Sequence, residues 1–188
     1  MPKQTPSQTV GPFFSRGLLW DDGGKVLFAG RGERITLAGR VLDGAGAPVA
    51  DALLETWQAD AAGKVPAAGD AARPHGYARV STGPDGGYAI ETVMPGAYPW
   101  ENHPFAWRPA HIHLSLFGNA YAQRVITQMF FPGDPLLAID PIFNSVPDGA
   151  ARLRMVADLA LEHGVERIAL GYRFDIVLRG PRATPMGV

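Results

Sequence analysis

Hydrophobic and polar residues alternate along most of this chain with the two-residue period of half-buried β-strands. The segment 83–87 (GPDGG) is a strong turn signal, so the runs on either side of it are predicted to pair as a hairpin. The pattern as a whole predicts an all-β fold. The predicted strands cover residues 35–43, 52–60, 76–82, 88–93, 121–131 and 166–180.

One stretch in the C-terminal half departs from this period. In residues 148–163 apolar side chains such as Leu153, Val156 and Leu159 recur at helical spacing, and Gly164 supplies a stop signal. This stretch is predicted to be the one helix. The segments 21–33 and 61–73 are rich in glycine, alanine or charged residues and are predicted to be loops.

Composition narrows the class of protein. The 188 residues, 46% hydrophobic and 19% charged, suit one domain over 1–188, with 1–33 as an N-terminal arm and loop. The 23 glycines and 17 prolines suit many short strands joined by turns. A net charge of −1 gives no reason to expect nucleic acid or an anionic membrane as a partner. With no cysteine, disulfides and thiolate metal sites are excluded. The chain shows no signal peptide or membrane-spanning run, so a cytoplasmic location is expected.

A candidate metal site lies in the middle of the chain. His111 and His113 stand two residues apart in a segment that is predicted to be a strand, which would place both imidazoles on the same face. Tyr98 follows a Pro-Gly turn and could fold back onto them, and a phenolate with two imidazoles suits Fe(III). Arg108 adds a cation that would suit an anionic substrate. The plainer alternative is that the two histidines are half-buried strand residues without a ligand.

Three motifs around these residues carry a family resemblance. They are Y-P-W from Tyr98, W-R-P-A-H-I-H from Trp107 and Q-x-F-F-x-G-D from Gln128. Together they resemble the intradiol ring-cleavage dioxygenases, in particular the protocatechuate 3,4-dioxygenases. The resemblance implies a β-sandwich whose ferric ion is held by two tyrosines and two histidines. On that pattern Tyr98, His111 and His113 are metal ligands, and Arg108 and Gln128 are catalytic residues that flank the pocket for substrate and oxygen.

The same resemblance implies that one metal ligand is missing. Iron-bearing members carry their other tyrosine two residues after the glycine of the W-Q-A-x-x-x-G motif, and here that position is Val65. Water, His75 or Tyr77 remain open as a substitute donor. Arg108, Asn119 and Arg124 are the candidate contacts for a substrate carboxylate.

The N-terminal opening T-P-S-Q-T-x-G-P resembles the start of the α chain of this group. There the segment lines the substrate cleft, which implies that Thr9, Gly11, Pro12 and Phe13 contact the substrate. The resemblance therefore implies an α subunit that completes the active site of a β subunit, with Fe(III) held by the β subunit. This chain differs from typical α chains of the family, because it keeps the Y-P-W and H-x-H motifs that they have lost. The alternatives are a self-sufficient homo-oligomeric ferric enzyme and, less favoured, a β-sandwich module that binds a phenolic ligand without chemistry.

Overall fold

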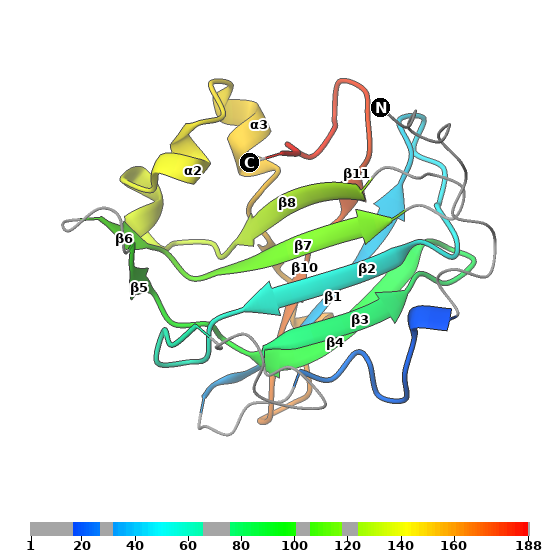
Figure 1. The fold of residues 1–188 in the computed structure, drawn as a ribbon, viewed down its shortest axis with the longest axis horizontal. Coiled ribbons are helices and arrows are strands. Elements are labelled where there is room, and N and C mark those ends of the chain that lie inside the picture. Colours follow the sequence, from blue (N-terminus) through cyan, green and yellow to red (C-terminus); the bar gives the residue numbers. More distant parts are fainter. Residues whose placement is uncertain (1–16, 27–31, 66–75, 101–105, 118–123, 188) are drawn as a thin grey trace, which may run out of the picture.

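The computed structural model describes residues 17–26, 32–65, 76–100, 106–117 and 124–187. In these ranges it has two facing β-sheets, a separate two-stranded sheet, and short helices at one end. In Figure 1 the four-stranded sheet crosses in front of β1 and β10 of the other sheet. This arrangement confirms the predicted β-sandwich class. The strands are β1 (Arg34–Leu42), β2 (Leu53–Gln58), β3 (Tyr77–Ser81), β4 (Gly87–Val93), β5 (Tyr98–Pro99), β6 (Trp107–Arg108), β7 (His111–Phe117), β8 (Arg124–Phe130), β9 (Asp158–Leu159), β10 (Leu170–Arg173) and β11 (Ile176–Val177).

The front sheet has the order β3-β2-β7-β8, with all neighbours antiparallel. In the second sheet β1 pairs antiparallel with β4 and parallel with β10 and β11, and β9 pairs with β10. Alternate residues of the two sheets meet in one core that includes Leu37, Ile90, Ile112 and Leu114. Residues on the other face of the front sheet, His113 among them, therefore point away from this core.

The hairpin predicted around residues 83–87 is wrong. The turn itself forms, with the Gly83 amide donating to the Gly87 carbonyl at 2.9 Å. However, β3 pairs with β2 in the front sheet, whereas β4 pairs with β1 in the second sheet. The turn therefore carries the chain from one layer of the sandwich to the other, a long-range choice that the local turn signal does not encode.

The helix predicted over 148–163 is also wrong beyond its first turn. Helix α3 covers only Gly149–Leu153, and the later part of the stretch contains β9 and the 3-10 turn η2 (Leu161–His163). The backbone of the segment that follows α3 pairs with β8 instead, because the Phe130 amide donates to the Met155 carbonyl and the Ala157 amide to the Phe130 carbonyl. Met155 is completely buried against this edge, so tertiary packing overrides the helical spacing.

Two further helical turns lie between β8 and α3. They are the 3-10 turn η1 (Pro135–Ala138) and the short helix α2 (Pro141–Asn144). Phe143 of α2 packs against Phe130 at the end of β8, which forms a second small core. No helix in the described ranges is long and apolar enough to cross a membrane.

The other predicted strands form within the described residues, which leave out 121–123, but the final one begins only at Leu170, because residues 166–168 form a turn. The final predicted strand is split into β10 and β11, because Asp175 leaves the ladder and its carboxylate accepts the Arg40 amide at 2.9 Å. At this point the main chain of Phe174 comes so close to Gly39 that a Cβ there would lie 1.9 Å from the Phe174 carbonyl oxygen. Only glycine fits at that position.

Candidate active site

The candidate site lies where three short segments meet at one end of the front sheet. Tyr98 of β5 pairs with Arg108 of β6, so the phenol and the guanidinium come from neighbouring strands. After Arg108 the chain turns through Pro109 and Ala110 and enters β7 at His111. His113 follows on the same face of β7, as the two-residue strand period predicts.

Three donor atoms converge at this point. The Tyr98 Oη lies 3.1 Å from the His111 Nε2, which in turn lies 3.1 Å from the His113 Nε2. The His111 ring contacts both of the others, with centroids 5.4 Å apart for Tyr98 and His111 and 4.9 Å apart for the two imidazoles. The residues that the sequence pattern grouped are thus brought together by the fold.

The hydrogen bond of His111 to the backbone determines which of its nitrogens is free. His111 Nδ1 lies 2.7 Å from the Pro109 carbonyl, which can only accept, so Nδ1 carries the proton and Nε2 has a lone pair. Burial, the neighbouring His113 and Arg108 lower the pKa of His111 to about 3. Burial and then Arg108 lower the pKa of His113 to about 4. Both imidazoles are neutral at pH 7, which is the form that binds metals.

The pKa of the Tyr98 phenol is shifted upward, whereas the pKa values of the two histidines are shifted downward. Burial raises the pKa of Tyr98, the charge of Arg108 lowers it, and Asp140 raises it again. A tyrosine in this setting is a phenol at neutral pH, and its deprotonation needs a further positive charge such as a metal ion.

The donor geometry fits a single transition-metal ion. Ligand atoms that subtend a right angle at a metal with bonds of about 2.1 Å lie about 3 Å apart, close to the two separations of 3.1 Å found here. No group of three or more His, Cys, Asp or Glu side chains with metal-binding geometry occurs in the described part of the chain. The set is therefore one phenol and two imidazoles, which suits Fe(III) as predicted.

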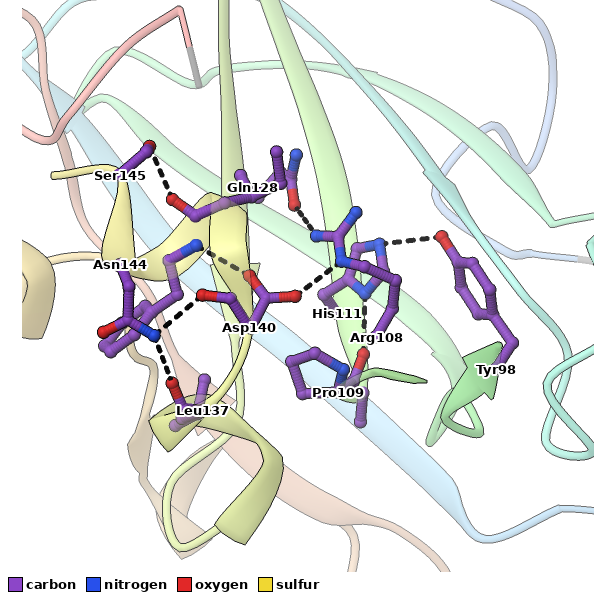
Figure 2. A network of polar contacts seen from close by, with 12 residues as sticks. Tyr98, Arg108, Pro109, His111, Gln128, Leu137, Asp140, Asn144 and Ser145 are labelled. Carbon is purple, nitrogen blue, oxygen red and sulfur yellow. Dashed lines mark hydrogen bonds and ion pairs between the residues drawn. The ribbon is translucent and has the colours of Figure 1, made fainter. Parts of the chain in front are cut away.

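Arg108 is buried beside these donors and is held by two partners. Its Nε donates to the Asp140 carboxylate at 2.6 Å, and its Nη2 donates to the Gln128 Oε1 at 2.5 Å. Figure 2 shows the guanidinium between Asp140 on one side and His111 and Tyr98 on the other. Arg108 and Gln128 thus lie next to each other at the site, as the family pattern implied. Asp140, which is completely buried, was missed by the sequence reasoning.

Aromatic side chains flank the donors. Trp57 of β2 packs against the His113 ring at 5.3 Å between centroids, and Phe130 of β8 packs against His111 at 5.9 Å. The Trp100 ring lies 5.7 Å from the Arg108 guanidinium carbon. Metal-type donors, aromatic rings and a buried cation are the kinds of group that recognise a planar, anionic aromatic molecule.

Val65 stands at the fourth ligand position, and a valine side chain has no donor atom for a metal. This side chain is 39% exposed. Gly63, two residues earlier, packs directly against the main chain of Ala97, so this loop runs beside Tyr98. Of the substitutes considered, Tyr77 is the wrong one: its hydroxyl donates to Glu55 at 2.5 Å and its ring stacks on Trp20.

The β-sheet register shows why Tyr77 cannot take part. Trp57 pairs with Tyr77 on one side and with His113 on the other, so a whole strand separates the phenol from the site. Burial and Glu55 also raise the pKa of Tyr77 to about 12.

Several predicted residues lie outside the described ranges: the substrate-contact residues Thr9, Gly11, Pro12 and Phe13, the substitute donor His75, and the carboxylate contact Asn119. Arg124 is described, and it does not reach the donors. It lies at the far end of β8, paired with Phe117, and donates to Ser115 at 2.6 Å. Arg108 is therefore the one carboxylate candidate that the described residues place at the site.

A β-sandwich that gathers a phenol and two imidazoles at one end of its front sheet, next to a buried arginine and glutamine, defines the intradiol class of ring-cleaving dioxygenases. A family model described as "Dioxygenase" matches residues 10–180. The chain belongs to this dioxygenase family, whose members depend on Fe(III). The resemblance drawn from the sequence motifs is confirmed.

Relatives with known functions agree with this assignment. The "Protocatechuate 3,4-dioxygenase alpha chain" of Burkholderia cepacia is 36% identical and covers 97% of this chain and 95% of its own length. The "Protocatechuate 3,4-dioxygenase beta chain" of the same organism is 54% identical, over 82% of this chain and 68% of its own length. Among solved structures, the dioxygenase domain of a dioxygenase–carbohydrate-binding protein fusion from Streptomyces sp. SirexAA-E is 26% identical, with a TM-score of 0.63 over 84% of this chain and 87% of that chain.

Proposed function

We propose that this chain is the α subunit of a protocatechuate 3,4-dioxygenase and that it completes the active site of an iron-bearing β subunit. The observation that carries this proposal is Val65, because the chain offers only three of the four side-chain donors that iron-bearing members supply. Two further points support it. The α-chain relative aligns over nearly the whole chain, including the N-terminal arm, and a β-chain relative exists in the same organism.

The reaction is the insertion of both atoms of O₂ into protocatechuate, with cleavage of the ring between its two hydroxyl groups to give 3-carboxy-cis,cis-muconate. It belongs to aromatic catabolism through the β-ketoadipate pathway, and we place it in the cytoplasm. When bound, Fe(III) would hold the catechol as its dianion and so make the ring electron-rich enough for direct attack by O₂. In the proposed complex Thr9, Gly11, Pro12 and Phe13 of this chain form part of the cleft wall.

A second candidate function is favoured by the convergence of Tyr98, His111 and His113. Their donor atoms are 3.1 Å apart and the His111 tautomer presents a free lone pair, so this chain has the donors to hold Fe(III) itself. In that case Arg108 stabilises negative charge on the substrate oxygen and Gln128 fixes the guanidinium. The higher identity to the β-chain relative supports the same candidate. The chain would then act as a self-sufficient ferric enzyme.

Iron content and visible absorption distinguish these two functions. The chain is purified alone and also after co-expression with its β-chain partner, and each sample is assayed for iron and for protocatechuate cleavage. A colourless chain alone and a red-brown, active complex support the α-subunit function. A coloured chain alone supports the second candidate. No ring cleavage by either sample overturns both.

The cleft-wall role has its own test in the complex. Substituting Thr9→Val and Gly11→Ala together should raise the KM for protocatechuate by about tenfold or more if the arm contacts the substrate. If the doubly substituted complex keeps its KM, the arm does not line the cleft.

A further inference from the structure

The segment after β8 repeats one short motif. Asp134-Pro135 opens η1 and Asp140-Pro141 opens α2, with the aspartate in each case at the N-cap. The Asp134 Oδ1 accepts the Leu136 amide at 2.9 Å, and the Asp140 Oδ1 accepts the Phe143 amide at 2.7 Å. These are ordinary capping bonds, and each uses one carboxylate oxygen.

The second oxygen of each aspartate reaches across to the turn that leads into the metal-site strand. The Asp134 Oδ2 accepts the Ala110 amide at 3.0 Å. The Asp140 Oδ2 accepts the Arg108 Nε at 2.6 Å. Residues 108 and 110 are thus both held by the helical segment, and Figure 2 shows Asp140 between α2 and Arg108.

Between these two attachments lies the carbonyl that orients the metal-site histidine. Pro109 accepts the Nδ1 proton of His111 at 2.7 Å, so the position of residue 109 determines the direction of the His111 lone pair. We propose that Asp134 and Asp140 are positioning residues that clamp residues 108–110 and thereby preassemble His111 and Arg108 at the metal site.

Capping alone does not explain this arrangement. A helix cap needs one acceptor and is usually exposed, whereas Asp140 is completely buried and its partner Arg108 is only 6% exposed. A buried ion pair contributes little net stability, because desolvation offsets the attraction between the charges. What the pair does provide is a guanidinium fixed at both ends, by Asp140 and by Gln128.

The inference rests on the second candidate function, in which this chain holds a metal itself. If the two aspartates act only as caps, replacing either one should affect the fold and leave the geometry of His111 and Arg108 unchanged. The two roles can be separated with asparagine variants, since asparagine is also a good N-cap but places an amide N–H₂ against the N–H of the second partner.

The first measurement follows hydrogen exchange by NMR in the full-length chain without metal. Asp140→Asn should remove the protection of the Arg108 Nε–H and leave the Ala110 N–H protected. Asp134→Asn should do the reverse. Asp148→Asn is the matched control, because Asp148 caps α3 from an exposed position through the Ala150 amide at 2.9 Å. It should change neither signal.

The second measurement is the affinity of the same full-length variants for Co(II), used as the metal probe. Loss of either clamp should weaken Co(II) binding by about tenfold or more relative to Asp148→Asn, the range seen when partners behind a metal ligand are removed. Unchanged affinity in both variants overturns the positioning role. So does an unsubstituted chain that binds no Co(II).

A second variant tests the proposal if Asp140→Asn does not fold. If Asp140→Asn is insoluble, the double variant Arg108→Met/Asp140→Asn leaves no unpaired buried charge and should fold while still losing metal affinity. Protocatechuate cleavage by the co-expressed complex is measured separately, so failure of the proposed function is distinguishable from failure of the clamp.

Discussion

Acid should destabilise this protein through His111 and His113, the two histidines of the candidate site. Both imidazoles are neutral in the folded chain, with the pKa of His111 lowered to about 3 and that of His113 to about 4, chiefly by burial. In the unfolded chain a histidine has a pKa of about 6.5. At a pH between the folded and the unfolded pKa, the histidines are protonated in the unfolded chain and neutral in the folded chain. The stabilising contribution is therefore complete above pH 6.5 and is lost as the pH falls.

The magnitude follows from the size of that window. Each histidine that is protonated only in the unfolded state lowers the free energy of unfolding by about 1.4 kcal/mol per pH unit. Two such groups over the two units from pH 6.5 to 4.5 give an upper limit of about 5 kcal/mol, as much as the whole stability of some small domains. Local opening of the site reduces this figure, because it allows protonation without global unfolding.

The assay is urea denaturation at pH 7.0, 6.0, 5.0 and 4.5 in buffer that contains a metal chelator. The control is the double variant His111→Asn/His113→Gln, in which asparagine can still donate to the Pro109 carbonyl. Carboxylates titrate in both proteins and cancel in the difference. The unsubstituted chain should lose about 2–5 kcal/mol more than the variant between pH 7.0 and 4.5. A difference that stays constant within about 1 kcal/mol would refute the reasoning, since the histidines would then be protonated in the folded protein.

Two further predictions concern the missing ligand and the opposite sheet. Val65→Tyr should raise Fe(III) retention by about tenfold or more and give or deepen a tyrosinate-to-iron absorption band, whereas Val65→Phe, which adds a ring without the oxygen, should do neither. Tyr88→Phe should lower the free energy of unfolding by about 1–2 kcal/mol, because the buried Tyr88 hydroxyl donates to the Phe174 carbonyl at 2.6 Å. Metal affinity should not change in that variant, since β4 belongs to the other sheet. A loss of metal affinity in Tyr88→Phe would show that the second sheet and the candidate site are not independent.

The sequence by itself determined the strands and the central donors. Strand period is a local property, and it places His111 and His113 on one face whatever the rest of the chain does. Tyr98 could be grouped with them because the Pro95-Gly96 turn comes just before it and both histidines follow within fifteen residues. The lack of a donor at Val65 was equally visible, since it depends only on which residue stands at one position of a motif.

The tertiary structure alone decided which strands pair and where the last helix ends. β3 and β4 belong to different sheets although a turn joins them, and residues beyond Leu153 pair with β8 although their spacing is helical. In both cases the competing structures have similar local free energies, so burial against distant strands selects between them.

The same holds for Asp140. The repeated Asp-Pro pair signals two helix starts, and nothing in its neighbourhood indicates that the second carboxylate oxygen reaches Arg108, thirty-two residues away in the chain. A capping bond is local and can be read from the sequence, whereas a buried ion pair between separate elements exists only once the fold has removed both groups from water.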